Sequence, residues 1–517
     1  MSCVEPGPAG VVVRCSMRVA SYLASLVCLL LASAGSAAWA QRAPATFASV
    51  EAMAAKLAAE PYKQPASIEG DMRRLSYDQY RALRSRPDTA LWRGDNSFFR
   101  VEFFPAGFIY EKPVQIFVVE SDIARPLALA PDLFDFSDTG LKTPPQKLEA
   151  AGFRLTYPLN RPDKFDEVAS FLGASYFRTV GRGQVYGASA RGLAIDTGIG
   201  GKPEEFPAFR AFWLVKPAGG ASDMTVWALL DSPGAAGAFA FTIRPGSRTV
   251  IDTKCVLFLR NDVSLLGIAP LTSMFFAGKT APARDDYRPE IHDSDGLYLA
   301  TGKGERIWRP LDNPAALVVS SFQDSNPRGF GLLQRERDFD RYQDSAASLQ
   351  ARPSLWVEPV GDWGDGEVRL VEIPTQSETN DNIVAFWVSR WPARKGERKE
   401  YAYRLSALSD EAALSPAGRV IATRDGTVPY APKQRRIVVE FAGGDLPSLE
   451  PEQPVTPDVS ATNAKITRTY VEALPWKRTW RLFIDFEPEG KKPVDLRAVL
   501  QLRGMPLTET WMSVYRP

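Results

Sequence analysis

The sequence predicts an all-β protein made of two β-sandwich domains, and three observations carry that prediction. Many short segments alternate apolar with polar residues and are rich in β-branched and aromatic side chains, a pattern typical of half-buried strands. Turn signals such as Pro245-Gly246 recur often, and the chain contains 41 prolines and 38 glycines. A polar, turn-rich stretch then separates two sets of strands, which predicts a large domain at 41–408, a linker at 409–427 and a smaller domain at 428–517.

Residues 1–40 have the pattern of a secretory signal peptide. Arg14 and Arg18 precede an apolar run from Ala20 to Ala34, and Ala38-Trp39-Ala40 has the small-x-small form of a signal-peptidase site. The apolar run is too short for a membrane anchor. We therefore expect cleavage after Ala40 and export of the remaining chain.

Composition and charge narrow the classes of function. The chain contains 62 Lys and Arg, 61 Asp and Glu, and one His. A net charge this close to zero is atypical of proteins that bind nucleic acid or an anionic membrane, so we expect an uncharged substrate or partner. Beyond the predicted cleavage site Cys255 is the only cysteine, which provides neither a disulfide nor a thiolate set for zinc. We expect no metal and no cofactor, and carboxylates are the groups that remain for catalysis.

Two short helices are expected at the start of the exported chain. Apolar residues recur at helical spacing between Phe47 and Leu57. Ser76, followed three residues later by Gln79, forms a capping-box pattern at the start of the second helix.

After these helices the period changes to two. The expected strands of the large domain include 97–104, 114–120, 224–230, 238–243 and 250–253. Cys255 follows the last of these in the apolar segment Lys254–Phe258, and we interpret it as a buried strand residue, not a nucleophile.

The strands restart in the last ninety or so residues. In Thr479–Phe486 the apolar residues occupy alternate positions and would face a core. This pattern predicts an immunoglobulin-like sandwich with no catalytic constellation of its own. Its clearest strands are 436–441, 479–486 and 495–502.

The only histidine lies in the stretch Arg288–Tyr298, beside two aspartates at alternate positions. If the stretch is extended, Asp293 and Asp295 share one face about 7 Å apart, while His292 points to the other face. The alternative is a strand-to-turn exit, in which the aspartates cap the backbone and Gly296 takes a positive φ.

Several motifs spread over the chain resemble the periplasmic glucan biosynthesis protein G and D family of Gram-negative bacteria. The resemblance covers almost the whole of the exported chain. The motifs are Ser175–Arg178, Gly183–Gly187, Ser189–Thr197, His292–Gly296, Gly331–Arg335, Asp338–Phe339, Tyr342–Asp344, Arg352–Pro359, Gly361–Gly364, Val371–Thr375 and Glu378–Trp387.

The resemblance implies a fold and an activity. It implies a large galactose-mutarotase-like β-sandwich, a smaller immunoglobulin-like domain, and a periplasmic role in making osmoregulated glucans with a β-1,2-linked backbone. Members of this family are also known as inverting β-1,2-glucanases. Carried over motif by motif, their general acid corresponds to Asp381 and their base to Asp293.

Physical reasoning leaves alternatives to these roles open. Inversion needs one protonated and one ionised carboxyl about 6.5–9.5 Å apart. Because an acid at neutral pH needs a raised pKa, we expect Asp381 to be more desolvated than Asp293. Asp295 competes for the role of base. Without the resemblance, Asn380-Asp381-Asn382 also fits a turn whose side chains bond the local backbone.

A neutral polysaccharide needs apolar surfaces under its rings and polar groups for its hydroxyls. The alternatives are that the aromatic residues form the core of the sandwich and that Arg335 and Asp338 pair with each other. The candidate glucan-binding residues are His292, Asp295, Tyr298, Arg335, Asp338, Tyr342, Trp356, Trp363 and Trp387.

Three functions therefore stand side by side. The first is a β-1,2-glucan-cleaving enzyme that shapes the glucan during synthesis. The second is a non-catalytic scaffold that receives nascent β-1,2-glucan from an inner-membrane glucan synthase, and the third is a purely structural periplasmic protein. The first two share a glucan-binding cleft, and replacement of the acid separates them, because general acid catalysis contributes about two to four orders of magnitude in rate.

Overall fold

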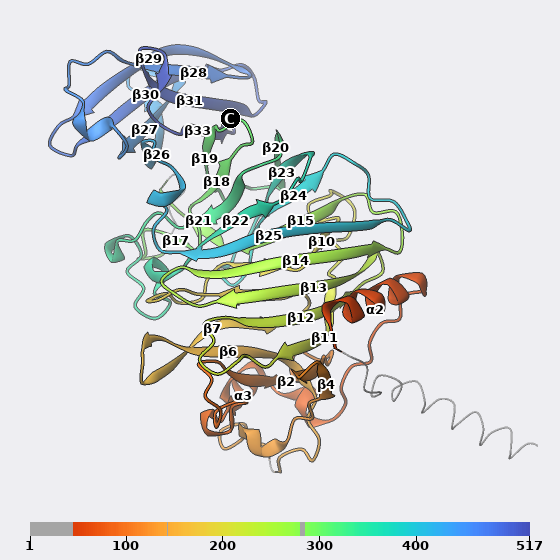
Figure 1. Ribbon diagram of the computed structural model, residues 1–517. Coiled ribbons are helices and arrows are strands. Elements are labelled where there is room, and N and C mark those ends of the chain that lie inside the picture. Colours follow the sequence, from red (N-terminus) through yellow and green to blue (C-terminus); the bar gives the residue numbers. More distant parts are fainter. Residues whose placement is uncertain (1–44, 142, 280–284) are drawn as a thin grey trace, which may run out of the picture.

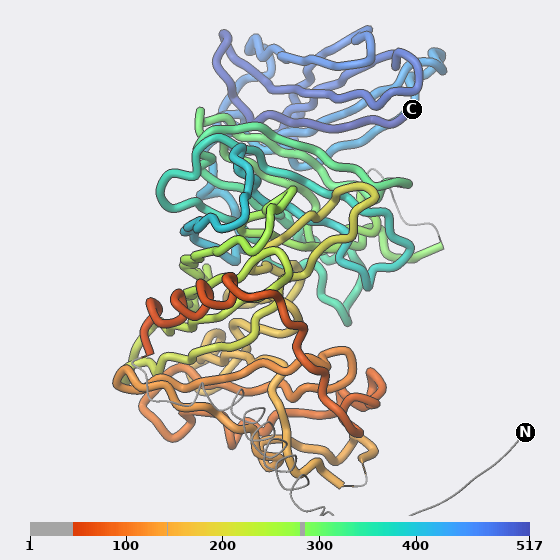
Figure 2. The backbone as a smooth tube through the Cα atoms, turned by 90° about the vertical axis from the view of Figure 1, so that its right-hand side faces the viewer, coloured from red at the N-terminus to blue at the C-terminus, as the bar shows by residue number. Residues whose placement is uncertain are grey.

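The computed structural model describes residues 45–141, 143–279 and 285–517, and the predicted signal peptide lies outside them. The expectation of an all-β sandwich architecture is confirmed (Figure 1). A large sandwich comes first, and a smaller one, drawn in blue, is stacked on one end of it (Figure 2). Within the described residues no helix has the length and apolar character needed to span a membrane.

The larger sheet of the first sandwich joins strands from both halves of the chain. It runs in the order β4 (Ile123–Pro126), β3 (Gln115–Glu120), β11 (Ala208–Val215), β12 (Met224–Asp231), β13 (Ala235–Arg244), β14 (Thr249–Leu259), β25 (Arg398–Leu408), β22 (Ser354–Val360), β21 (Gly329–Leu333), β18 (Gly296–Ala300) and β19 (Arg306–Pro310). Strands were expected in β3, β12, β13 and β14, and they are present.

The second sheet packs against the first and carries the candidate site on its ends and loops. It runs in the order β2 (Arg100–Pro105), β6 (Ala150–Arg161), β7 (Lys164–Leu172), β8 (Tyr176–Thr179), β9 (Ser189–Arg191), β15 (Leu266–Ser273), β24 (Ile383–Ser389), β23 (Asp365–Glu372) and β20 (Val318–Ser325). Smaller pairings add β10 (Ala194–Ile195) to β15, β16 (Phe275–Ala277) to β17 (Ile291–His292), and β1 (Arg84–Ser85) to β5 (Phe134–Asp135).

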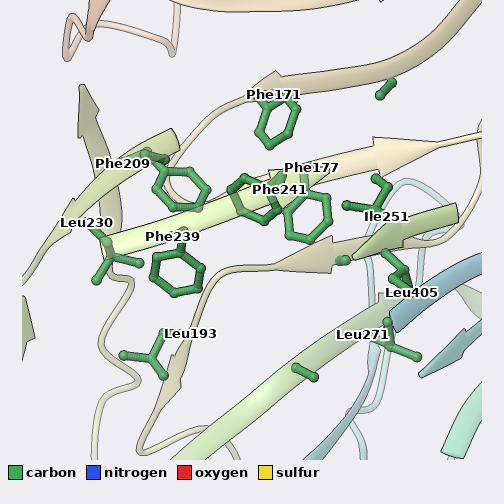
Figure 3. Packing of buried hydrophobic residues seen from close by; sticks show 14 of the residues in the cluster. Phe171, Phe177, Leu193, Phe209, Leu230, Phe239, Phe241, Ile251, Leu271 and Leu405 are labelled. Atoms are coloured by element: carbon green, nitrogen blue, oxygen red, sulfur yellow. The ribbon is translucent and has the colours of Figure 1, made fainter. Parts of the chain in front are cut away.

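Phenylalanines fill the space between the two sheets (Figure 3). The Phe171 and Phe177 rings, from β7 and β8, are stacked with centroids 5.5 Å apart, and Phe241 from β13 lies 5.1 Å from Phe177. Cys255 is buried in β14, as expected. Because alternate residues of a strand point to opposite faces, this packing of Phe177 directs Tyr176 and Arg178 away from the core.

Both expected helices are present. α2 (Phe47–Ala59) lies on the outer face of the larger sheet and buries Val50 and Ala54 there. α3 (Tyr77–Ala82) begins with the predicted capping box, in which the Gln79 N–H donates to the Ser76 hydroxyl at 3.3 Å and the Gln79 side chain accepts from the Ser76 N–H at 2.9 Å. Short 3₁₀ turns are η1 (Asp71–Arg74), η2 (Pro87–Thr89), η3 (Pro131–Leu133), η4 (Phe339–Arg341), η5 (Leu349–Ala351), η6 (Ala412–Leu414) and η7 (Leu446–Ser448).

The C-terminal sandwich has two sheets with a shared apolar core. One sheet runs β26 (Arg419–Val428), β27 (Ala431–Ala442), β30 (Thr479–Pro488) and β29 (Ala464–Leu474), and the other runs β28 (Val455–Ala461), β31 (Val494–Leu502) and β33 (Thr510–Tyr515), with β32 (Met505–Pro506) beside β31. The alternate apolar residues of β30 are buried, as expected. β33 also pairs in parallel with β19, so one sheet continues from the large sandwich into the small one.

The predicted linker at 409–427 is too long. Residues 419–427 belong to β26, which is paired along its length with β27 and buries Val420 in the C-terminal core. The connection therefore consists of residues 409–418 alone. The prediction extended the linker into β26 because the alternation of apolar and polar residues in this strand is weak and half of its side chains are exposed.

The stretch around the histidine is not one extended strand. β17 ends at His292 and β18 begins at Gly296, with a bend between them. The Asp293 N–H donates to the Met274 carbonyl, whereas the Asp295 N–H donates to the Leu333 carbonyl, each at 2.8 Å. The backbones of Asp293 and Asp295 are therefore bonded to different segments of the chain. The prediction that the two side chains share one face of a strand is wrong.

Gly296 is needed because a larger residue would not fit at its position. It does not adopt the positive φ that the strand-to-turn alternative predicted. It opens the strand β18, and its φ lies outside the left-handed region. A Cβ at this position would collide with the Trp308 ring, which lies across it. The glycine therefore makes room for an aromatic side chain next to the domain interface.

Candidate active site

Asp381 lies in the loop between β23 and β24, and its neighbour Asn382 fixes that loop. The Asn382 side-chain amide accepts from the Phe275 N–H at 2.8 Å and donates to the carbonyls of Phe275 and Ile373, each at 3.0 Å. The Asp381 side chain is exposed on the wall of a pocket of about 420 Å³. Among the described residues none donates a hydrogen bond to its carboxylate.

Asp293 approaches the same place from the other side. Its N–H donates to the Met274 carbonyl, whereas Asn382, next to Asp381, is bonded to the adjacent residue, Phe275. The side chain of Asp293 is 3% exposed and forms an ion pair with Arg352. A Cβ on Gly187 would lie 2.6 Å from the Arg352 Cδ, so this glycine leaves the space in which the arginine reaches Asp293.

The two carboxylates influence each other. Burial raises the pKa of Asp293 to about 6, with Arg352 opposing the shift and the charge of Asp381 adding to it. Desolvation also raises the pKa of Asp381, against the lowering effect of Arg178, Arg352 and Arg191. The charge of Asp381 therefore disfavours ionisation of Asp293, which shows that the two carboxyls are in electrostatic contact.

The expectation that Asp381 is the more desolvated of the two is reversed. Asp293 is the buried residue, because the bend after His292 turns it inward against Arg352. Asp381 is open to the pocket, although protein atoms surround it on the remaining sides and raise its pKa.

The pocket at Asp381 continues into an aromatic groove. A second pocket of about 260 Å³ shares part of its lining with the first, including Tyr110 and Tyr176. Ile109 and Phe206, which are 67% and 54% exposed, stand on its walls. Accessible aromatic rings beside the Asp381 carboxyl suit a ligand with apolar faces and polar edges.

A buried arginine supports these rings. Arg191 is 2% exposed and forms an ion pair with Glu204 at 2.7 Å. Its guanidinium carbon lies 5.3 Å from the centre of the Tyr176 ring and 5.1 Å from that of Phe206. Sequence reasoning missed Tyr110, Tyr176 and Phe206, although Tyr176 stands in a motif that signalled the family.

The comparisons with known proteins decide the family. A family model described as "Periplasmic glucan biosynthesis protein, MdoG" matches residues 46–515. The chain belongs to this family. "Glucans biosynthesis protein G" of Ralstonia nicotianae is 45% identical over 90% of this chain and 95% of its own length. "Probable glucans biosynthesis protein D" of Shewanella oneidensis is 41% identical, covering 95% and 92% of the two chains. "Glucans biosynthesis protein G" of Pseudomonas aeruginosa is 41% identical, covering 96% and 98%.

Five aromatic residues that were candidates for binding glucan lie in the core of this family member. Each is between 0% and 5% exposed, so none can stack on a sugar without unpacking the fold. Their positions support the alternative interpretation, in which these rings are core residues. They are Tyr298, Tyr342, Trp356, Trp363 and Trp387.

His292 is also enclosed and lies among side chains. Its Nδ1 and Nε2 lie 2.8 Å from the Gln334 Oε1 and 3.0 Å from the Glu290 Oε2. Its ring stacks on Phe275 and meets the edge of Tyr342. The side chain is 0% exposed, so it supports the bend from within and is not a glucan contact.

The remaining polar candidates connect the two domains or stand apart from the groove. Arg335 pairs with Glu411 and Glu509, each at 2.6 Å, and its guanidinium lies 3.5 Å from the centre of the Trp308 ring. Asp295 accepts the Arg335 N–H at 3.1 Å in the same cluster. Asp338 is exposed and caps η4 through the Asp340 N–H. The sequence alternative of an Arg335–Asp338 pair is not found among the described contacts.

Within the described ranges, no group of three or more His, Cys, Asp or Glu side chains is arranged to hold a metal ion. The groove itself offers the Asp381 carboxyl, the side chains of Arg178 and Arg210, and aromatic rings, while the buried Asp293 is in electrostatic contact with Asp381.

Proposed function

We propose that the protein cleaves β-1,2-glucan with inversion in the periplasm, as a processing step in glucan biosynthesis. The observation that carries this proposal is the electrostatic contact between Asp293 and Asp381, two carboxyls on separate segments, of which Asp381 lies on the wall of an aromatic groove. In this scheme Asp381 protonates the leaving glycosidic oxygen, and Asp293 activates a water molecule on the opposite face of the sugar.

The surroundings of each carboxyl suit its role. Asp381 is accessible to a ligand in the groove, and desolvation raises its pKa, which favours the protonated form that a general acid requires. Asp293 has the Arg352 guanidinium as counter-ion, which favours its ionised form and hence its action as a base. Their mutual repulsion favours the state in which one is protonated while the other is charged.

The groove suits a neutral polysaccharide. Tyr110, Tyr176 and Phe206 offer apolar faces on which pyranose rings can lie, and Arg178 and Arg210 on the lining offer donors for hydroxyl groups. The near-zero net charge of the chain agrees with an uncharged ligand. An inner-membrane glucan synthase stays a predicted partner, as the source of the chain.

The experiment compares Asp381→Asn, Asp293→Asn and Asp295→Asn for cleavage of linear β-1,2-glucan and for glucan affinity. Asp295 is the matched control, since it lies two residues from the base but faces the domain interface. We expect the first two variants to lose about two to four orders of magnitude in rate and retain affinity, because general acid–base interactions act in the transition state. If all three variants cleave glucan at the parental rate, the catalytic proposal is wrong, and a non-catalytic glucan scaffold is the function that remains.

A further inference from the structure

Another pocket, separate from the two pockets of the groove, opens at the end of β24 opposite to Asp381. Asp381 precedes Ile383, the first residue of this strand, and the pocket begins where the strand ends at Ser389. The pocket has a volume of about 410 Å³, close to that of the pocket at Asp381. At a rise of about 3.3 Å per residue, the strand separates the two by roughly 20 Å. Residues 262–266 and 399–401, next to β14 and within β25, complete its walls.

An exposed tryptophan stands at this pocket on a fixed loop. Trp391 is 68% exposed, although its large apolar side chain would be more stable if buried. The backbone N–H of Trp391 donates to the Ser389 hydroxyl at 3.3 Å. Two residues later, the Ala393 carbonyl accepts from the Val263 N–H at 2.9 Å. These bonds order the loop backbone that carries the ring, which lowers the entropy lost when a ligand binds there.

The charges at the rim of this pocket are balanced. Each basic side chain on the lining lies within 4 Å of a carboxylate, so positive and negative charges alternate at the rim. Serine and tyrosine side chains on the walls, Ser264, Ser389 and Tyr401, are neutral. The three pairs are Arg390 with Asp365 at 3.6 Å, Arg394 with Asp262 at 3.4 Å, and Lys399 with Glu397 at 3.0 Å.

This chemistry fits a neutral ligand rich in hydroxyl groups. The paired guanidinium and carboxylate groups retain donors and acceptors that a hydroxyl can use, and the Trp391 ring offers a flat face for the apolar side of a sugar. An anionic ligand would compete with the carboxylates that already lie beside these cations. A purely apolar ligand would cover polar groups to which it cannot form hydrogen bonds.

We propose that the pocket beside Trp391 is a second carbohydrate-binding site, which holds a neutral glucan chain with a glucosyl ring against Trp391. The identity of the ligand rests on the proposed function. A long chain bound at both sites is retained through the high effective concentration that a tether gives, while a short oligosaccharide occupies each site separately. The second site would thus favour long glucans over short ones at the cleaving groove.

The test is isothermal titration calorimetry on the full chain with Asp381→Asn, so that glucan is bound and not consumed. We expect two sites for a short β-1,2-linked oligosaccharide and one after Trp391→Ala. We also expect Trp391→Ala to lower the affinity for a long glucan about tenfold or more, since the chain can then no longer bind both sites at once. The matched control is Trp476→Ala, which removes a tryptophan that is 77% exposed on the C-terminal sandwich and should change neither quantity.

The outcomes separate the two proposals. If glucan binds at one site, and its affinity is unchanged by Trp391→Ala but lowered by Tyr176→Ala, the second site is overturned and the cleaving groove stays in place. Absence of any glucan binding by the Asp381→Asn protein overturns both. Since Trp391 is exposed, an unchanged thermal midpoint in Trp391→Ala would show that a lost site reflects the missing ring and not unfolding.

Discussion

Asn382 and Phe275 exchange two hydrogen bonds, with the Phe275 N–H donating to the Asn382 side-chain carbonyl at 2.8 Å and the Asn382 amide donating to the Phe275 carbonyl at 3.0 Å. Asp381 directly precedes Asn382, and Asp293 is bonded to Met274, directly before Phe275. One asparagine therefore sets the position of the acid-bearing loop relative to the residue proposed as base.

Replacement of this asparagine tests the geometry of the site. Asn382→Ala removes three hydrogen bonds, two of them buried, and leaves the Phe275 N–H unpaired, so we expect a loss of about 1–3 kcal/mol in unfolding free energy. We also expect glucan cleavage per folded molecule to fall, because Asp381 is no longer held in place. Urea denaturation and turnover assays measure the two effects.

The matched control is Asn380→Ala, which removes a single bond from the Asn380 amide to the Thr375 hydroxyl at 3.2 Å. It should affect both quantities less. If Asn382→Ala cleaves glucan like the parent, the loop does not depend on this anchor.

The pH dependence follows from the raised pKa of Asp293, about 6. As a base this residue acts when ionised, so kcat/KM should fall as the pH drops through that value. Arg352→Gln removes the cation that lowers the pKa of Asp293, and the acidic limb should then move to higher pH. Activity that instead rises as the pH falls below about 6 would make Asp293 the acid.

Variants of the groove and of the core should have opposite phenotypes. Tyr176→Ala removes a ring from the groove, and we expect glucan affinity to fall about fivefold, or roughly 1 kcal/mol. Trp387→Ala removes a fully buried ring and should cost about 3–5 kcal/mol in unfolding free energy. Calorimetric titration and denaturation distinguish the two. If folded Trp387→Ala loses more glucan affinity than Tyr176→Ala, then Trp387 contributes to glucan binding and the assignment of its ring to the core alone is wrong.

The contact between the domains should depend on Arg335. Its side chain is 9% exposed and pairs with Glu509, which is 2% exposed, so Arg335→Ala leaves a buried carboxylate without its partner. Breaking a buried pair costs about 3–5 kcal/mol, and we expect a lower denaturation midpoint and faster proteolysis within residues 409–418. Arg419→Ala is the control, because Arg419 is 46% exposed and lies 3.8 Å from Glu411. Equal effects of the two replacements would contradict a role of Arg335 in holding the domains together.

Local patterns in the sequence predicted the local structure well. The capping box at Ser76, the alternation in β30 and the buried Cys255 are set by neighbours in the chain, and the structure confirms them. The bend after His292 could not be predicted, because it arises from bonds to Met274 and Leu333, which are distant in the sequence.

The candidate site was predicted in part, for a related reason. Motifs selected the segments of Asp293 and Asp381, and the fold brings the two side chains into electrostatic contact. They did not show which face of a strand each aromatic residue occupies. Trp387 and Tyr176 both stand in strands of the second sheet, yet Trp387 points into the core and Tyr176 into the groove. That difference depends on how the sheets pack, since alternate residues point to opposite faces.

The most direct test of the central proposal is incubation of the purified chain with linear β-1,2-glucan, monitored by ¹H NMR from the first turnovers. The pair Asp381 and Asp293 predicts new reducing ends whose initial configuration is α, inverted from the β-linkage. Products that first appear as the β anomer would contradict inversion by this pair, and the absence of any new reducing end would contradict cleavage.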